Sequence, residues 1–229
     1  MGTISSKQGA LLTDCDTNSA YSIAYQTLYA NIRFDWDSEH TRQHSILLAT
    51  PAAYPGQITA VANVAIAAAQ NGTPTVLVDS NLHTPALQQL FKVNAPTGLS
   101  DLLLANREIT AQALASHLHE TDVPRLRLLC AGKALAQPQD VGRLLTARLQ
   151  DLLTSIRQYL ADTESKPSLI IFNSPPVLAG IDAAQISALV DQTFLLIASG
   201  RTTRTQVRRA QEQLQRAHAH LLGIVMLDV

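Results

Sequence analysis

Cysteine, aromatic and charged residues are all scarce in this chain of 229 residues. Its two cysteines, Cys15 and Cys130, do not form a disulfide framework by number or spacing and suit a reducing compartment. Aromatic residues make up 4% of the chain, so leucine, alanine, isoleucine and valine must build the core. No apolar run reaches the roughly 18 residues of a membrane span, and the first ten residues lack the apolar centre of a signal peptide. We therefore expect a cytoplasmic protein without a transmembrane segment.

An excess of charge of either sign is also missing. The formal net charge is −1, which provides no general attraction to nucleic acid or to an anionic membrane. Apolar residues make up 46% and charged residues 15% of the chain, which indicates a globular protein rather than a disordered one. The length suits one α/β domain, and we expect no nucleic-acid partner.

Short apolar runs alternate with helical patterns along the whole chain. Near-continuous apolar strands of this kind are typical of a mostly parallel sheet that is covered by helices on both faces. The pattern predicts strands at 45–49, 75–79, 127–130, 168–172, 193–198 and 221–227, and helices at 18–34, 139–160, 183–190 and 204–217, besides an alanine-rich helix that ends at Asn71 and Gly72.

The most informative stretch runs from Ala49 to Gly72, where a strand leads through a Pro/Gly turn into a helix of small residues. A strand, a turn and a helix in this order form the setting of a phosphate-binding loop, whose N–H groups and helix N-terminus hold phosphate. Such a loop needs a lysine for the outer phosphates and a Ser/Thr hydroxyl for Mg²⁺. In place of Gly-Lys-Ser-Thr the chain reads Gly56, Gln57, Ile58 and Thr59.

Several separated motifs, in order, resemble the bacterial tyrosine-kinase and chain-length-regulator family of exopolysaccharide assembly, whose members are deviant-Walker P-loop ATPases. The resemblance covers nearly the whole chain. Its motifs are Val78 to Leu87, Phe91, Gly98 to Leu103, Leu129 to Gly132 with Pro138, Asn173 to Leu178 with Asp182 and Ala183, Gly200 with Thr202, and the amino-terminal Ala24 to Ile32. It implies a three-layer P-loop NTPase-like fold with about seven mostly parallel strands, formed by residues 45–229, and an amino-terminal helical extension at residues 1–44.

The departures from the family pattern lie at the positions that bind nucleotide and metal in the family. The first loop is one residue shorter than usual, Gln57 replaces the lysine, and Ile58 replaces the Mg²⁺-binding serine, with Thr59 as a possible substitute. Asp79 is retained, but Asn81 and Asn173 stand at positions where the family has acids. Asp228 stands where the resemblance implies an asparagine beside adenine. Phosphoryl transfer depends on the positioning of the substrate and on charge stabilisation. These substitutions therefore remove groups on which the reaction depends most.

Three interpretations follow from the resemblance. In the first, the chain is a degenerate, catalytically inactive homologue that needs no cofactor. It then regulates or scaffolds capsular, exopolysaccharide or lipopolysaccharide-type biosynthesis and export. In the second, it is a divergent ATP-dependent tyrosine kinase or ATPase in which Thr59 and Asp79 hold Mg²⁺ and Arg201 or Arg204 replaces the lysine. A partitioning or septum-site switch is the third interpretation and is less favoured.

The resemblance also implies partners at the inner face of the membrane. These are a membrane-anchored polysaccharide chain-length protein or an active kinase paralogue. In the family the amino-terminal helix carries charged residues used in oligomerisation, whereas this chain has Ile23, Gln26 and Tyr29 there. A homo-oligomer is therefore possible but would lack those charge pairs.

Two further patterns have ordinary explanations. The pairs His117/His119 and His218/His220 have a spacing of two, which on a helix turns the rings apart, so we expect solvated side chains and no metal site. Five arginines between residues 201 and 216 are most often a solvated helix face, although such a face can also bind an acidic partner.

Overall fold

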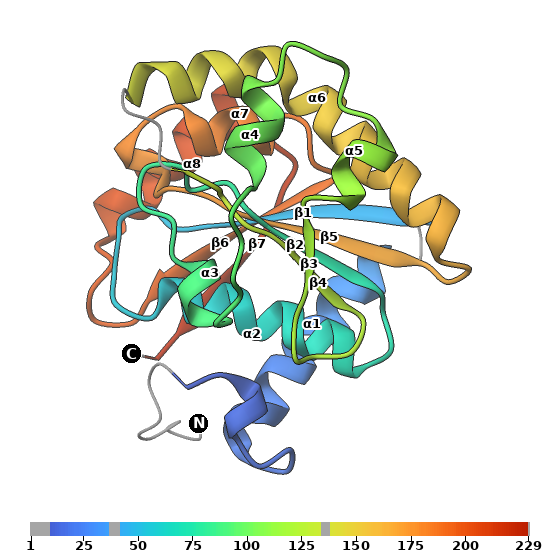
Figure 1. The fold of residues 1–229 in the computed structure, drawn as a ribbon. Coiled ribbons are helices and arrows are strands. Elements are labelled where there is room, and N and C mark those ends of the chain that lie inside the picture. Colours follow the sequence, from blue (N-terminus) through green and yellow to red (C-terminus); the bar gives the residue numbers. More distant parts are fainter. Residues whose placement is uncertain (1–9, 37–41, 134–137, 229) are drawn as a thin grey trace.

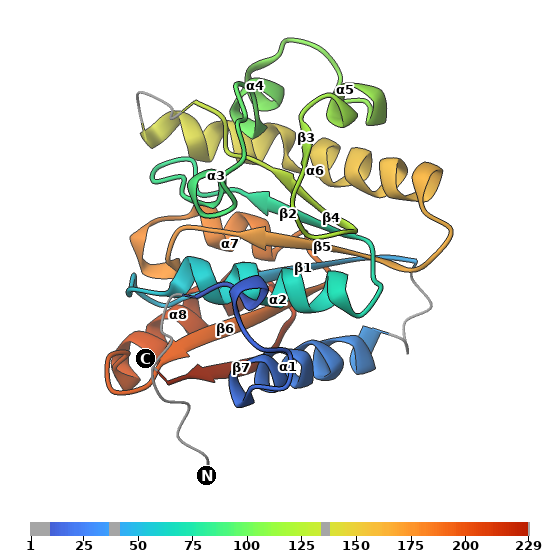
Figure 2. The same cartoon turned by 60° about the horizontal axis from the view of Figure 1, so that its bottom comes forward.

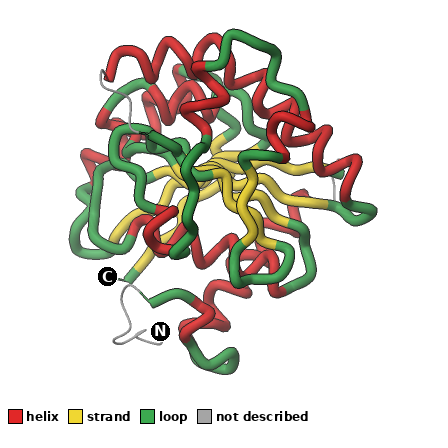
Figure 3. The backbone as a smooth tube through the Cα atoms, viewed as in Figure 1, coloured by secondary structure: helices red, strands yellow, loops and turns green. Residues whose placement is uncertain are grey.

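The computed structural model describes residues 10–36, 42–133 and 138–228 and contains a seven-stranded sheet with helices on both faces (Figures 1 and 3). The strand order is β3-β4-β2-β5-β1-β6-β7. The strands are β1 (Gln43–Ala49), β2 (Thr75–Asp79), β3 (Leu118–Glu120), β4 (Leu126–Leu129), β5 (Ser168–Asn173), β6 (Gln192–Ala198) and β7 (Leu221–Leu227). All pairings are parallel except the one between β3 and β4, which is antiparallel. The predicted three-layer fold is confirmed.

Two helices form most of one outer layer. They are α1 (Ala20–Trp36) and α2 (Gln57–Gln70), with the short α3 (Leu87–Leu90) and a 3-10 turn at Leu12–Asp14 beside them. Most residues of α2 are buried because its alanines allow α1 and the sheet to approach it closely. Asn63 of α2 ties down the amino-terminal segment, since it accepts a hydrogen bond from the Leu12 N–H (2.9 Å) and donates to the Tyr21 hydroxyl (2.9 Å). The division of the chain at residue 44 stays a proposal.

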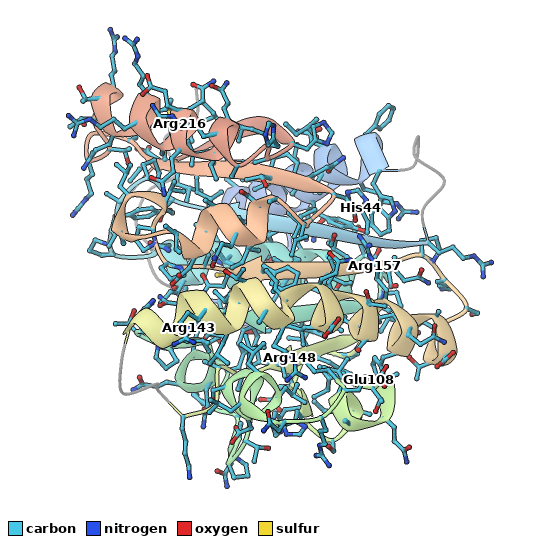
Figure 4. The ribbon with its side chains drawn as sticks, turned by 90° about the horizontal axis from the view of Figure 1, so that it is seen from above. His44, Glu108, Arg143, Arg148, Arg157 and Arg216 are labelled. Atoms are coloured by element: carbon cyan, nitrogen blue, oxygen red, sulfur yellow. The ribbon has the colours of Figure 1, made fainter. Side chains whose placement is uncertain are left out.

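Among the described residues, the other layer contains five helices. They are α4 (Leu99–Leu104), α5 (Ala111–Ala115), α6 (Pro138–Thr163), α7 (Asp182–Ser187) and α8 (Arg204–Arg216), and a 3-10 turn at Val177–Ala179 precedes α7. The apolar side of α6 packs Leu145, Leu149, Leu152 and Ile156 against the sheet. Figure 4 shows Arg143, Arg148 and Arg157 along this helix, with Arg157 directed toward the region of His44.

Two features differ from the sequence-based expectations. The pattern did not predict α5 or β3, which contain five and three residues and include polar side chains. The helical geometry considered for the two histidine pairs does not apply to them: His119 lies in β3, His117 in the turn before it, and His218 and His220 in the segment after α8. Within the described residues, no group of three or more His, Cys, Asp or Glu could hold a metal ion.

Candidate functional site

Three loops meet where neighbouring central strands end. The strands β2, β5 and β1 lie side by side, and their register pairs Asn173 with Asp79 on one side and with Leu48 on the other. In open parallel sheets ligands bind at this carboxyl edge. The fold therefore brings together the loops that the sequence singled out (Figure 2).

The loop after β1 leads into α2 through a glycine with positive φ. Gly56 has a φ of +92°, which favours glycine, and stands directly before the first residue of α2 without a side-chain cap. Gln57 is buried, and its Nε2 donates to the Ser174 carbonyl oxygen at 3.4 Å. Ile58 packs against the cluster of α1 and α2, and Thr59 is 8% exposed. The side chain that the resemblance aligns with lysine is thus uncharged and bonded to the loop after β5.

Asp79 is completely buried at the end of β2, and both of its oxygens accept hydrogen bonds from the chain. Oδ1 accepts from the Asn173 side-chain amide (3.0 Å) and from the Asn81 N–H (3.4 Å). Oδ2 accepts from the N–H groups of Leu87 (3.1 Å) and Ala86 (3.2 Å). Burial raises the pKa of Asp79 above its usual value, and these four hydrogen bonds oppose the shift. The carboxyl group therefore organises the turn that follows β2.

The two asparagines at the acidic positions are held differently. Asn81 closes a local turn, because its Nδ2 donates to the Thr84 hydroxyl (3.0 Å) and its Oδ1 accepts from the Thr84 N–H (3.2 Å). The backbone carbonyl of Asn173 accepts from the N–H of Ser80 (2.9 Å) and from its hydroxyl. The buried Oδ1 of Asn173 has no hydrogen-bond partner within the described residues. It is the one unsatisfied side-chain acceptor contributed by these two asparagines.

Asp228 lies away from these asparagines, on the other side of the loop. It lines a cavity of about 430 Å³ together with Gly56, Thr59, Arg201 and Tyr25. Asn81 and Gln57 line a second cavity of about 610 Å³, which shares Gly56 and Thr59 with the first. The loop thus separates the two groups of expected site residues. Arg201 reaches the first cavity, whereas Arg204 lines neither.

The sequence did not reveal a pair of side chains beside this site, in which His83 is exposed and Asp182 is buried. His83 Nε2 and Asp182 Oδ2 lie 2.6 Å apart in a third cavity of about 770 Å³ that Arg143 also lines. Both residues belong to motifs that carried the resemblance, but they are 99 positions apart and no spacing links them.

Bacterial tyrosine-protein kinases are similar to this chain in sequence. YwqD of Bacillus subtilis is 27% identical over 211 residues, which cover 92% of this chain and 82% of YwqD. CpsD of Streptococcus agalactiae is 28% identical over 175 residues, which cover 76% of this chain and 70% of CpsD. The putative tyrosine-protein kinase EpsB of Ralstonia solanacearum is 29% identical over 180 residues, which are 79% of this chain and 22% of EpsB. No protein-family model matches the chain.

Solved structures of the same kind share the fold. The chimerical protein CapA2B2 matches with a TM-score of 0.76 and 25% identity over 96% of this chain and 90% of its own. The kinase domain of Escherichia coli tyrosine kinase ETK matches with a TM-score of 0.73 and 20% identity over 87% and 72%. The cell division ATPase MinD of Pyrococcus furiosus matches with a TM-score of 0.60 and 20% identity over 80% and 71%. The chain is therefore a homologue of the bacterial tyrosine-protein kinases, with the P-loop NTPase fold of their kinase domains.

Proposed function

We propose that this chain is a catalytically inactive homologue of the bacterial tyrosine kinases. It acts by binding a partner in capsular or exopolysaccharide biosynthesis. The observation that carries the proposal is the contact of Gln57 Nε2 with the Ser174 carbonyl oxygen. The side chain at the position of the phosphate-binding lysine brings no positive charge and is bonded within the protein. A charge-assisted hydrogen bond is roughly twice as strong as a neutral one, so the triphosphate loses a main source of binding energy.

The remaining residues also fit ATP and Mg²⁺ poorly. Ile58 offers no oxygen to a metal, and Asn81 and Asn173 are neutral. The hydrogen bonds that Asp79 accepts from Asn173, Asn81, Ala86 and Leu87 occupy both of its carboxylate oxygens. Losing one preorganised contact to a transition state commonly costs about 2.7–4 kcal/mol, and several are missing together. We therefore derive no phosphoryl-transfer step for this site.

A divergent active kinase is the competing proposal, and the lining of one cavity favours it. Arg201 lines the same cavity as Gly56 and Thr59, so a guanidinium group stands near the loop that lacks lysine. In that proposal Thr59 and Asp79 hold Mg²⁺. The names of the relatives agree with it, since all those quoted are tyrosine kinases.

The proposed partner is a membrane-anchored chain-length protein or an active kinase paralogue, which would place the chain at the inner face of the membrane. No helix within residues 10–36, 42–133 or 138–228 combines the length and apolarity of a membrane span. A partner would therefore supply any attachment through the described part of the chain. The partner's identity can be tested by co-purification from the native host.

Titration calorimetry with ATP and Mg²⁺ tests whether the nucleotide site survives. We expect no binding in the micromolar range, because the loop lacks its cation and its metal ligand. An Arg201→Ala variant is the control for the competing proposal. Micromolar affinity that falls on this substitution would reject the inactive site and support the rescuing arginine.

A further inference from the structure

The strand β7 forms one edge of the sheet, and among the described strands it pairs with β6 alone (Figure 2). The Leu227 carbonyl accepts a hydrogen bond from the Ser199 N–H at 2.8 Å, so the backbone polar groups of Leu227 face β6. Alternate residues of a strand direct these groups to opposite sides. The N–H and C=O groups of Ile224 and Met226 therefore point to the free edge, where a further strand could bind.

Apart from a register shift where β7 begins, between Leu221 and Gly223, this edge has little protection against pairing. Residues 221–227 include no charged residue and no proline, and the side chains of Ile224 and Met226 are 51% and 69% exposed. Natural edge strands are commonly short or carry charges, bulges or prolines that prevent association. The opposite edge follows that rule, because β3 has three residues and includes His119 and Glu120.

One flank of α8 places positive charge beside this edge. Gln213 Nε2 donates to the Gly180 carbonyl oxygen at 2.7 Å, which turns the flank of Gln213 toward the centre of the sheet. Arg209 and Arg216 share that flank, because they stand at helical spacings of four and three from Gln213. Figure 4 labels Arg216 on this helix. Helical geometry places Arg204 and Arg208, also four apart, on the opposite flank of α8, and the helix packs against β7 as well. We infer that this opposite flank faces the edge at β7.

Positive charge exceeds negative charge near the edge at β7. Residues 201–228 include five arginines and only two acids, although the whole chain has a net charge of −1. Both Arg204 and Arg208 are exposed, and Glu212 pairs with Arg208 at 3.0 Å. An acidic segment beside β7 would therefore meet an excess of positive charge.

The other face of the edge is hollow and mainly apolar. The cavity of about 430 Å³ lies between α1 and the second half of β7, and Tyr25, Leu28, Val225 and Leu227 contribute to its lining. Successive side chains of a strand point to opposite faces of the sheet. Every second side chain of a strand added to β7 would thus point toward this cavity, and the others toward α8.

We propose that β7 binds an extended segment of a partner protein as an additional strand. The segment has acidic side chains toward Arg204 and Arg208, and apolar side chains toward the cavity beside α1. Main-chain hydrogen bonds provide affinity in such strand addition, and pockets for alternate side chains provide specificity. This proposal rests on the proposed function, because it gives the binding partner a docking surface.

Charge argues against a second copy of this chain as the occupant. A two-fold axis that pairs β7 with itself makes the strands antiparallel and leaves both α8 helices on the same face of the joined sheet. The flanks with Arg204 and Arg208 would then face each other across the new contact. Like charges placed opposite each other disfavour that dimer and favour an acidic partner.

A fluorescent peptide of about ten residues that alternates glutamate with valine or phenylalanine is a suitable probe. Its anisotropy is measured with the full chain in the absence of nucleotide. The Met226→Pro variant removes an N–H that points to the free edge and leaves the hydrogen bonds to β6 intact. We expect it to weaken binding at least about tenfold, whereas Met226→Ala, which keeps the N–H, retains most of the affinity.

Arginine reversals on the two flanks of α8 provide a matched pair. Arg204→Glu with Arg208→Glu should weaken binding at least about tenfold, and Arg209→Glu with Arg216→Glu should change it much less. Equal effects of the two pairs, or unchanged binding by a folded Met226→Pro variant, would overturn the proposal. So would a homodimer in sedimentation equilibrium that Met226→Pro dissolves. Absence of peptide binding would reject this surface but leave the calorimetry with ATP unaffected, so the two proposals fail separately.

Discussion

Gln57 and Asp79, which the resemblance aligns with polar positions of a phosphate site, are each bonded to neighbouring loops. Gln57 reaches Ser174 across 117 positions of sequence, and Asp79 reaches Asn173 across 94. The identity of each side chain was visible in the sequence, but its partner was not. Long-range contacts of this kind depend on how the strands are ordered, which single-residue patterns do not report.

The first prediction restores the missing groups. In the double variant Gln57→Lys with Ile58→Ser, a cation and a hydroxyl return to the loop, and we expect ATP affinity to rise at least about tenfold. Calorimetry measures the change against the single variant Ile58→Ser. No gain in affinity would mean that the shortened loop or the altered acids, rather than these two side chains, prevent binding.

The second prediction concerns the pH dependence of stability. Asp191 accepts hydrogen bonds from the Ser45 N–H and hydroxyl (both 2.7 Å) and from Arg157 (2.8 Å). Burial acts to raise the pKa of Asp191, but these hydrogen bonds and the charge of Arg157 outweigh it, so the pKa lies below its usual value.

A lowered pKa in the folded state stabilises the protein above the unfolded pKa, near 4, and the contribution disappears as the pH falls through the folded value. Asp191→Asn should therefore lower the free energy of unfolding by about 2 kcal/mol at pH 7 and by less near pH 3. Urea unfolding at both pH values measures this, with the exposed Asp151→Asn as a control. An equal loss at both pH values would contradict the assigned ion pair.

At the scale of elements, the sequence predicted the long and the buried segments well. The expected strands at 75–79 and 221–227 agree with β2 and β7, and the alanine-rich helix before Asn71 is α2. Periodicity failed for β3 and α5, because three or five residues hold too few apolar positions to show a period.

The third prediction concerns the contact between α4 and the end of β4. The Leu99 N–H donates to the Cys130 carbonyl oxygen at 2.8 Å, which presses the backbone at Gly98 against that of Cys130 and Gly132. A Cβ at Gly98 would lie 2.2 Å from the Cys130 oxygen and 2.5 Å from the Gly132 nitrogen.

We expect Gly98→Ala to lower the free energy of unfolding by about 3 kcal/mol or more. The atoms that a Cβ would meet belong to the backbone, and they can move away only if α4 or the end of β4 shifts. Gly180→Ala is the control, since a Cβ there meets nothing within 4 Å and the backbone is extended. Thermal unfolding compares the two variants. Equal melting temperatures would show that α4 can shift at little cost.

At the scale of the whole molecule, the alternation of apolar strands and helices was sufficient to predict a parallel sheet covered on both faces. The ordered motifs identified the kinase-like fold, which the similarity to CapA2B2 and to the ETK kinase domain confirms. Two cavities flank the loop after β1, and their volumes and lining residues give the shape of the site. A chemical role stays a proposal for Asp79, Asn81, Asn173 and Asp228. The shape is compatible with a site retained as scaffold.

Phosphoryl transfer from ATP is the measurement that tests the inactive site most directly. The purified chain is incubated with γ-labelled ATP and Mg²⁺, and released phosphate and phosphotyrosine are counted beside an Asp79→Ala variant. We predict that both proteins give the same background rate, since the loop lacks its lysine and its metal ligands. Turnover or phosphotyrosine that the wild-type chain produces and Asp79→Ala abolishes would contradict the account.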